Sequence, residues 1–453
     1  MAGTRSSPRA DGRGESALVR AVDRSLAEHV TASARVAVAL SGGRDSVALL
    51  AAVIECGRVK PADVLAIHVH HGLSAQADAW ADFCARLAAG HGIALVTQRV
   101  GIDLHDADGI EAAARSARYE ALRSAAREAG ATAVLLAHHQ DDQAETLLLQ
   151  LLRGAGVHGL AAMPIARTSD GLIWLRPLLD IPRRDLEAFV RARKLAYVDD
   201  DSNATDRHRR NALRQRVVPA LESVAGGYPA TIARAAAHQA EAARLIDDLA
   251  TLDAASLMDS GTLDRAGLAA LAPHRARNVL RHFLQCQGLR PPSTARLHAM
   301  LSQLGTARPD ARIRFVHEGV WFGVFRGRLL AHRAAPPIYE CAWQGEPFLE
   351  LPHGRLAFVT AHGAGLSATC LHNGALVVRP RAGGERLQPF ATRPRRALKA
   401  WLQEASMPSW QREALPLLFC GDVLAAVPGL GVDVAFQAQA DQPGFTLDWR
   451  PAP

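Results

Sequence analysis

The feature that most constrains how this chain folds is residues 36–50, VAVALSGGRDSVALL. The run from Val36 to Leu40 is apolar without polar alternation and predicts a buried strand. An apolar helical pattern resumes at Val47. The polar residues between them are Ser41, Gly42, Gly43, Arg44, Asp45 and Ser46. A strand, a glycine turn and a helix start present backbone N–H groups to an anion, so we predict a phosphate-binding loop here.

The chemistry of this loop indicates a nucleotide. Gly42 and Gly43 allow positive φ and let the backbone approach a ligand closely. Ser41 and Ser46 add hydroxyl donors, and Asp45 offers oxygen to a divalent cation. The Lys-Ser/Thr ending of a Walker A motif is absent. The loop resembles the SGGxDS loop of the PP-loop ATP pyrophosphatases, which cleave ATP between its α- and β-phosphates. An ordinary tight turn is the competing interpretation.

The composition is that of an ordinary globular chain. With 453 residues, 49% hydrophobic and 21% charged, it predicts two or three domains. The net charge of +7 suits a polyanionic partner such as RNA. Six scattered cysteines without a C-x-x-C pair favour a reducing cytoplasm over a disulfide framework or zinc site. Residues 1–15 predict a disordered tail and no signal peptide, and no long apolar run predicts a membrane span.

Strand-like and helix-like segments alternate from residue 16 to about 175. Apolar runs predict strands at 36–40, 64–69, 93–96, 132–137 and 172–175. Helical patterns occupy 16–30, 76–89, 109–128 and 141–153. The alternation predicts an α/β fold with a doubly wound parallel sheet, in which a ligand binds beyond the C-terminal strand ends. The glycine loop and residues 138–142 follow two such ends, so both should line one cleft.

A second polar cluster is HHQDDQAET, residues 138–146. Asp141 and Glu145 are four residues apart and share one helix face. A stripe predicted to point toward the core continues through Leu148, Leu151 and Leu152. Acidic residues at a helix N-terminus also favour the macrodipole, which is the competing explanation for Asp142. We predict that His138 contacts a nucleotide and that Asp141 or Glu145 positions magnesium or water.

Two further groups flank the predicted cleft. His68 and His70 alternate at the end of the second strand, but a third ligand at metal spacing is missing. We therefore expect histidines in a polar cleft and not a metal pair. Glu111 and Arg115 form an i,i+4 pair that a surface salt bridge would explain. Alternatively, Arg115 points into the cleft toward a phosphate, for which a planar guanidinium is well suited.

Basic residues concentrate in two later segments. Residues 199–216 combine turn and cap residues with arginines, and residues 379–410 interleave basic side chains with tryptophans such as Trp401. Both suit phosphate contacts and base stacking in RNA. A solvated charged face and a core position for Trp401 are the alternatives. The predicted domains are a catalytic domain at 16–218, a mostly helical domain at 219–335 and an α+β domain at 336–453.

Taken in order, these motifs resemble the tRNA(Ile)-lysidine synthetases. The matches are SGGRDS, HVHHGL, GIEAAARSARY, LLAHHQDDQAETLLLQLLRGAG, RPLL, DDDSNATDRHRRNALR, RPRAGGERLQP and LKAWLQEASMPSWQR. SGGRDS marks only the superfamily, and HHQDDQAET is shared with some thiolating relatives. The GGER…LK…PSWQR segment, joined to the first domain, is what looks specific to lysidine synthetases.

The resemblance implies a two-step ligation. In this family the C2 oxygen of the first-anticodon-position cytidine attacks the α-phosphate of ATP and releases diphosphate. The lysine ε-amine then attacks C2 of the adenylated base and expels AMP, which changes codon reading from AUG to AUA. The implied partners are ATP, Mg²⁺, L-lysine and a tRNA(Ile) with a CAU anticodon, and a homodimer is left open. The two later domains would bind the tRNA.

The resemblance also implies roles for individual residues. The implied ATP-binding residues are Ser41, Gly42, Gly43, Arg44, Asp45, Ser46, His68 and His138. The implied catalytic residues are Asp45, Arg115, Asp141, Glu145 and Arg210. The implied tRNA-binding residues are Arg209, Asn211, Arg214, Arg379, Arg381, Arg386, Arg395 and Lys399. Asp45 would hold Mg²⁺, the two catalytic arginines would touch phosphate or the adenylated intermediate, and Asp141 or Glu145 would orient metal or lysine.

Two alternatives stay open at this point. One is a tRNA thiolase of the same superfamily, although such enzymes generally use paired cysteines or an iron–sulfur cluster, and no such pair is present. The other is an RNA-binding protein with a vestigial ATP site.

Overall fold

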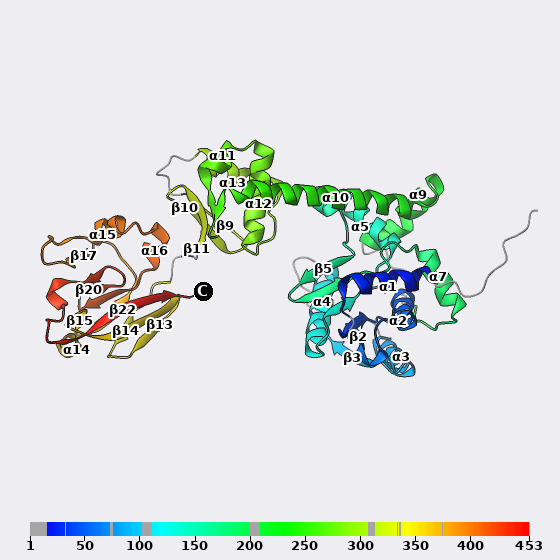
Figure 1. Cartoon of the computed structure of the whole chain (residues 1–453), viewed down its shortest axis with the longest axis horizontal. Coiled ribbons are helices and arrows are strands. Elements are labelled where there is room, and N and C mark those ends of the chain that lie inside the picture. The colour runs from blue at the N-terminus through cyan, green and yellow to red at the C-terminus, as the bar shows by residue number, and fades with distance from the viewer. Residues whose placement is uncertain are drawn as a thin grey trace, which may run out of the picture. The chain divides into compact units, whose positions relative to one another are not determined.

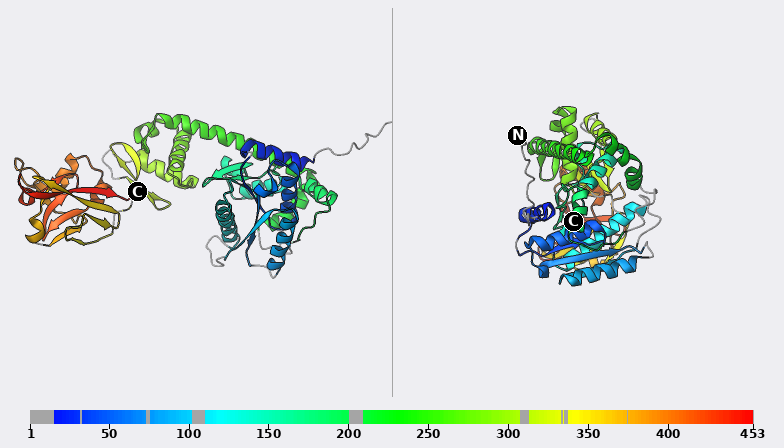
Figure 2. Two further views of the ribbon diagram at one scale, coloured as in Figure 1. Left: turned by 60° about the horizontal axis from the view of Figure 1, so that its bottom comes forward. Right: turned by 90° about the vertical axis from the view of Figure 1, so that its right-hand side faces the viewer.

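The computed structural model describes residues 16–31, 33–72, 76–101, 110–199, 209–306, 313–332, 334, 337–373 and 375–452, with the side chains of 110–112, 372 and 373 excepted. The chain forms two compact units, Met1–Ile246 and Asp247–Pro453 (Figures 1 and 2). The domain boundaries expected at 218 and 335 stay predictions. Within the described ranges, none of the helices combines the length and the apolar character that a membrane crossing requires.

The first unit is built on a six-stranded sheet of described residues in the order β3-β2-β1-β4-β6-β5. The strands are β1 (Val36–Ala39), β2 (Val64–His70), β3 (Ala94–Arg99), β4 (Ala133–Leu135), β5 (Ala166–Ser169) and β6 (Leu172–Leu175). All neighbouring strands are parallel except β5, which pairs antiparallel with β6 at the edge. The predicted parallel α/β sheet is confirmed, and the edge strand β5 is an addition to it.

Both faces of this sheet carry an apolar core. The helices are α1 (Ala17–His29), α2 (Arg44–Cys56), α3 (Ala77–Gly90), α4 (Ile110–Glu128), α5 (Gln140–Leu152), α6 (Val157–Leu160) and α7 (Arg183–Ala192), with a 3-10 turn η1 (Pro61–Asp63). Val36 and Val38 pack with α1, α2, α3 and α7, whereas Ala37 and Ala39 pack with α4 on the other face. Side chains alternate along a strand, so β1 contributes to both cores and is fully enclosed.

The strand order places the two predicted loops together. The chain runs outward from β1 through β2 to β3, and then returns to β4 on the other side of β1. Ligands bind at such a reversal point in open α/β sheets. The glycine loop leaves the end of β1, and the HHQDD loop leaves the end of β4. The loops meet as predicted, because His139 Nε2 lies 3.6 Å from Asp45 Oδ2.

The end of α5 departs from the sequence prediction. Leu151 and Leu152 are 55% and 77% exposed, so the predicted stripe toward the core is wrong for these two residues. The buried part of α5 is its polar first half, and the helix contacts α6 and α8.

The described part of the arginine-rich segment, from residue 209 on, is helical, but it is not a regular α-helix. It consists of α8 (Arg209–Ala212), a π-helical turn η3 (Leu213–Val217) and α9 (Val218–Val224). The Val218 N–H donates to the carbonyl of Leu213, five residues back. Pro219 has no N–H to donate to residue 215, which removes an α-helical bond at the same place.

The region after α10 (Tyr228–Ala255) mixes helices with a small sheet. The helices are α11 (Arg265–Ala270), α12 (Pro273–Cys286) and α13 (Thr294–Thr306). The strands are β7 (Met258–Asp259), β8 (Thr262–Asp264), β9 (Arg314–His317), β10 (Val320–Phe325) and β11 (Arg328–His332), in the order β7-β8-β11-β10-β9. The alternation at 313–330 predicts a hairpin, and it proves to be a meander that β8 joins. Phe283 and Phe322 are fully buried between the helices and this sheet.

The C-terminal part is α+β, as predicted, with two sheets packed together. The strands are β12 (Cys341–Trp343), β13 (Phe348–Leu351), β14 (Gly354–His362), β15 (Leu366–Ser367), β16 (Leu376–Arg379), β17 (Arg386–Leu387), β18 (Arg396–Ala397), β19 (Leu417–Cys420), β20 (Val423–Val427), β21 (Gly431–Val432) and β22 (Pro443–Pro451). The helices are α14 (Cys370–Asn373), α15 (Leu398–Glu404), α16 (Ser409–Ala414) and the 3-10 turn η4 (Val434–Phe436). Trp343 of one sheet stacks on Phe358 of the other at 3.9 Å between ring centroids.

Helix α16 docks onto the β9–β11 meander within the second unit. Trp410 stacks on His332 at 4.4 Å between ring centroids. A Cβ on Gly323 would lie 2.5 Å from the Trp410 ring, so only glycine fits beneath it. Arg314 donates to Ser409 and forms an ion pair with Glu413 at 3.0 Å. These contacts join the middle and C-terminal parts of the chain.

Candidate active site

The glycine loop is held in one conformation by its own side chains. Gly42 has a φ of 87°, and a Cβ there would lie 3.2 Å from Cys84 Sγ. Gly43 has an ordinary φ of −69°, so of the two glycines only Gly42 adopts the positive φ that glycine allows. The Ser46 hydroxyl donates to the Gly43 carbonyl at 2.8 Å, and the Ser41 N–H donates to Ser46 Oγ at 3.2 Å. The loop thus leads directly into the N-terminus of α2, where backbone N–H groups attract anions.

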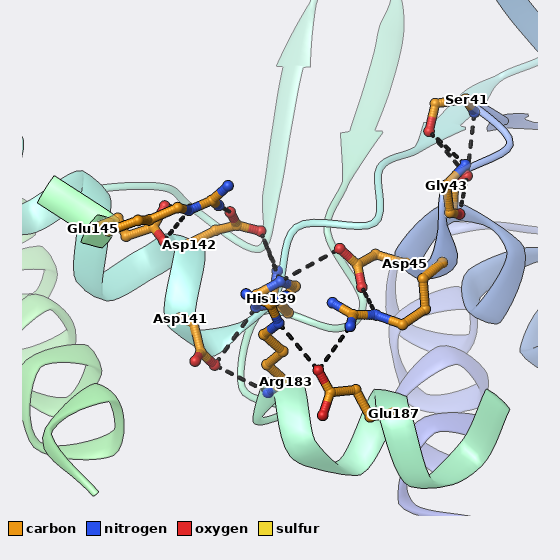
Figure 3. A network of polar contacts seen from close by, with 12 residues as sticks. Ser41, Gly43, Asp45, His139, Asp141, Asp142, Glu145, Arg183 and Glu187 are labelled. Atoms are coloured by element: carbon orange, nitrogen blue, oxygen red, sulfur yellow. Dashed lines mark hydrogen bonds and ion pairs between the residues drawn. The ribbon is translucent and has the colours of Figure 1, made fainter. Parts of the chain in front are cut away.

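Asp45 lies in the first turn of α2 and faces the loop after β4 (Figure 3). Its Oδ1 accepts from Arg44 Nε at 3.0 Å. Burial raises the pKa of Asp45, but the neighbouring His139 and Arg44 outweigh burial and bring it to about 2. The carboxylate is therefore ionised at neutral pH. Its side chain keeps 35% of its surface exposed and can accept a cation.

His139 is buried among three carboxylates (Figure 3). Its Nε2 lies 3.6 Å from Asp45 and 3.5 Å from Asp142, and its Nδ1 lies 3.6 Å from Asp141. Burial lowers the pKa of His139, but Asp141, Asp45 and Asp142 together raise it to about 10. The imidazolium therefore persists at neutral pH and offsets part of the negative charge at this point.

Glu145 and Asp142 hold two arginines of α8 and η3 against α5. Arg214 donates from Nε and Nη2 to the two oxygens of Glu145, at 2.6 and 2.9 Å, and from Nη2 to Asp142 at 3.2 Å. Arg210 Nε lies 3.0 Å from Glu145 Oε2, and its Nη2 donates to Thr146. Glu145 is 4% exposed. This bidentate, buried arrangement clamps the arginine-bearing segment onto the cleft.

Asp141 is directed toward α7. Its Oδ2 accepts the backbone N–H of Arg183 at 3.0 Å, at the first residue of that helix. Burial raises the pKa of Asp141, but its contacts with His139 and the Arg183 N–H lower it below its ordinary value. Glu187 on the next turn accepts from Arg44 Nη1 at 2.7 Å and from Arg183 Nε at 3.3 Å. Helix α7 therefore closes one side of the site (Figure 3).

The two histidines predicted to contact ATP are both desolvated. Burial lowers the pKa of His68, whose Nδ1 lies 2.9 Å from the carbonyl oxygen of Leu40. The neutral His68 ring donates this hydrogen bond to the Leu40 carbonyl and so supports the chain where β1 ends. Burial lowers the pKa of His138 to about 3, and its Nδ1 has no hydrogen-bond partner. Both rings are neutral at pH 7.

Arg115 lies on α4. It is exposed, and its Nη2 donates to the Tyr119 hydroxyl at 3.3 Å. The side chain of Glu111 lies outside the described residues, so the i,i+4 pair stays a prediction.

The residues predicted to bind tRNA fall into two groups. Arg209, Arg386 and Lys399 are exposed. The others are engaged inside the protein. Arg214 is in the clamp described above, Asn211 is buried, Arg379 lies over the Phe419 ring at 4.1 Å, Arg381 pairs with Glu385 at 3.1 Å, and Arg395 pairs with the fully buried Asp433 at 2.6 Å.

The predicted stacking of tryptophans on RNA bases is wrong for two residues. Trp401 is 4% exposed and donates its indole N–H to the Leu387 carbonyl at 2.9 Å. Trp410 is 7% exposed and lies against Gly323. Both are core residues, because the apolar neighbours on α15 and the β10 surface cover them.

Three segments of the chain match known protein families. Residues 15–221 match the PP-loop domain family, 263–330 the TilS substrate binding domain and 376–449 the TilS substrate C-terminal domain. The chain is 40% identical over 426 residues to a tRNA(Ile)-lysidine synthase of Nitrosomonas europaea, covering 92% of each. It is 44% identical over 436 residues to one of Ralstonia nicotianae, covering 92% of this chain and 93% of the relative. The chain belongs to the tRNA(Ile)-lysidine synthase family.

Membership in the lysidine synthase family confirms the resemblance seen in the motifs. The chain is accordingly a ligase of this family, with an ATP-using PP-loop domain. The thiolase and RNA-binding alternatives are not favoured.

Several residues of this lysidine synthase site escaped the sequence analysis. His139 lies at the centre of the carboxylates, whereas the sequence favoured its neighbour His138. The HH pair was visible, but which histidine faces the glycine loop depends on how the chain leaves β4. Glu187 and Arg183 were missed because α7 carries no motif. Its strong amphipathic pattern, with Leu186, Phe189 and Val190 buried, is the signal that could have located the helix.

Proposed function

We propose that the cleft between β1 and β4 joins L-lysine to C2 of the first-anticodon-position cytidine of a tRNA(Ile) with a CAU anticodon. ATP would adenylate the C2 oxygen with release of diphosphate, and the lysine ε-amine would then expel AMP. The modified base would read AUA in place of AUG. The observation that carries this proposal is the meeting of the glycine loop with the carboxylates around His139, in a chain of the lysidine synthase family.

The glycine loop would bind the phosphates of ATP. Gly42, Gly43 and the first turn of α2 offer backbone N–H groups, and Ser41 and Ser46 line the same turn. Such groups are fixed before the reaction and stabilise charge that develops on the phosphates. The leaving diphosphate would stay on this loop, and His138 would lie near the nucleotide.

Asp45 fits a magnesium ion bound mainly by the nucleotide. Mg²⁺ in nucleotide sites usually takes one or two carboxylates and several phosphate and water oxygens. Asp45 is ionised, partly exposed and located at the phosphate loop. Bound there, Mg²⁺ would offset the negative charge of the phosphates. No cluster of three protein ligands occurs among the described residues, which suits a site completed by substrate oxygens.

The acidic wall would receive the lysine substrate. The side chains of Asp45 and Asp141 are 35% and 24% exposed, compared with 5% for Glu145. An ammonium group entering the cleft therefore meets Asp45 or Asp141 first. Glu145 already binds two arginines, so we assign it to holding Arg210 in place. Arg210 would then contact the phosphate of the adenylated intermediate, and Arg115 would contact another phosphate of the substrates.

The tRNA would contact the exposed basic residues first. Arg209, Arg386 and Lys399 are exposed and form no ion pair with another described residue, and Arg386 donates one hydrogen bond, to the Arg395 carbonyl. The engaged residues Arg379, Arg381 and Arg395 would mainly shape the surface that carries them. We place the reaction in the cytoplasm, which suits six cysteines that are all unpaired. A homodimer stays open.

The direct test is to incubate the full chain with ATP, L-lysine and tRNA(Ile) and to measure the mass of the tRNA. We expect an increase of one lysine less one water on a single cytidine, with AMP and diphosphate released. Asp45→Asn should abolish the increase, and Asp82→Asn on α3 serves as the control. Formation of ADP, or an unchanged tRNA, would refute the proposal.

A further inference from the structure

A second charged cluster at the strand ends contains no carboxylate. Arg176 directly follows β6, and Arg115 and Arg118 lie on α4. All three are neighbours of His138 after β4. Burial is the main cause of the low pKa of His138, Asp142 opposes it, and the charges of Arg176, Arg118 and Arg115 lower it further. Arg115, Arg118 and Arg176 are called the arginine cluster below.

Arg176 is a buried guanidinium. It is 7% exposed, its Nη1 donates to the Pro164 carbonyl at 3.0 Å, and its Nε has no hydrogen-bond partner among the residues that the structure describes. No carboxylate among the described residues forms an ion pair with it. Burial lowers its pKa. A buried charge is unfavourable unless it is paired, so this position suits an anion that arrives from outside.

Tyr119 connects Arg176 to the rest of the cluster. Its hydroxyl accepts from Arg115 Nη2 at 3.3 Å and also hydrogen-bonds Arg176. Its ring packs against Trp174 at 5.1 Å between centroids, and Trp174 is itself buried. With guanidinium groups donating to its oxygen, the Tyr119 O–H is left to donate to another acceptor. The cluster therefore presents positive charge and a hydroxyl donor in a fixed arrangement.

We propose that the arginine cluster binds a backbone phosphate of the RNA substrate, next to the cytidine that is modified. This inference rests on the proposed function. The strand β6 is two positions from β1, which separates Arg176 from the ATP loop by roughly 10 Å at the usual strand spacing. Because the ATP phosphates would lie on the glycine loop, the arginine cluster remains available to bind a different phosphate. Guanidinium groups match phosphate oxygens in geometry and charge, and such contacts fix the register of a nucleic acid.

The test measures tRNA binding by the full chain without ATP or lysine, over 50 to 300 mM salt. Arg176→Met should raise the Kd for tRNA by about tenfold and reduce the slope of log K against log salt by about 0.7, the value for one phosphate of a single strand. Arg176→Lys should restore most of the slope because it keeps the charge. The KM for ATP in the complete reaction should change less than twofold. Arg153→Met, at an exposed arginine after α5, is the control and should match the wild type in all three measurements.

Other results would overturn the assignment. If Arg176→Met raises the KM for ATP tenfold and leaves tRNA binding unchanged, the phosphate belongs to the nucleotide. If only the melting temperature falls, Arg176 has a structural role alone. Should Arg176→Met fail to fold, the exposed Arg118→Met decides, and an unchanged salt slope there refutes the proposal. A wild-type chain that makes no lysidine but shows the Arg176 effect would overturn the proposed function and support the subsite.

Discussion

Gly42 is the residue whose conformation the phosphate loop depends on most. Its φ of 87° is unfavourable for any other residue, and an added Cβ would press on Cys84. We expect Gly42→Ala to destabilise the fold by about 1–2 kcal/mol. We also expect it to raise the KM for ATP at least tenfold, measured by AMP release at varied ATP.

The neighbouring glycine provides the matched control. Gly43 has a φ of −69° and room for a Cβ at ordinary contact distance, so Gly43→Ala should disturb the loop much less. Equal effects of the two substitutions would show that backbone conformation is not what the loop requires.

His139 predicts a specific dependence of stability on pH. Its folded pKa of about 10 lies above the ordinary value of 6.5, so its contribution is complete below pH 6.5 and is lost as pH rises through 10. The free energy of unfolding of wild type minus that of His139→Gln should therefore be constant in acid and shrink between pH 7 and 10. Urea unfolding at several pH values measures it. A constant difference up to pH 10 would contradict the raised pKa.

For single residues, the sequence predicted which residue types stand at the site better than it predicted which residues contact one another. Two short motifs contain the residues of the site that were predicted: one holds the glycines and Asp45, and the other holds the acidic residues at 141–145. The sequence alone therefore predicted that these residues belong to a site. The clamp of Glu145 on Arg214 joins residues 69 positions apart. Nothing in either segment specifies that contact, which depends on how η3 packs against α5.

Among the contacts between elements, the packing of α5 against the arginine-bearing helices α8 and η3 depends most on a single charged side chain. Glu145→Gln removes the charge that both Arg210 and Arg214 use, and breaking a buried pair costs about 3–5 kcal/mol. We expect amide exchange of residues 209–224 to accelerate strongly, while β1 and β4 stay protected. Hydrogen-exchange mass spectrometry measures this.

A charge-matched substitution on α10 is the control for that experiment. Glu241→Gln removes a carboxylate outside the clamp and should leave exchange in 209–224 unchanged. If Glu145→Gln also leaves it unchanged, the clamp does not order the segment.

Among the elements, the strands of the regular βα units were predictable, whereas β5, β7 and β8 were not. The buried strands β1, β2 and β4 are apolar on both faces, and a run of that kind is unmistakable. β5 at the edge is partly exposed and reads ARTS, and β7 and β8 have two and three residues. Such segments carry no periodic pattern of their own. They become strands because they pair with neighbouring strands.

In the second unit, the packing of Trp410 on Gly323 joins α16 to the β9–β11 meander. Gly323→Ala would place a methyl group 2.5 Å from the ring, so we expect α16 to separate from the β9–β11 meander. Overpacking of this kind costs about 1–3 kcal/mol. The affinity for tRNA should fall, while the KM for ATP stays the same, because the ATP site lies in the first unit. Equilibrium binding and ATP kinetics distinguish the two.

Gly305→Ala is the corresponding control in the same unit. A Cβ there meets nothing within 4 Å, and the residue lies in α13, where alanine is favoured over glycine. If Gly323→Ala binds tRNA as tightly as Gly305→Ala, the packing does not matter for recognition.

Three titratable groups of the candidate site keep one charge state across the physiological pH range. Asp45 titrates near pH 2, His138 near 3 and His139 near 10, so none of these groups changes protonation between pH 5 and 8. The incoming amine, with an ordinary pKa near 10.4, is mostly protonated throughout that interval. Turnover that grows tenfold per pH unit there would therefore report deprotonation of the lysine amine and not a titration of these three side chains.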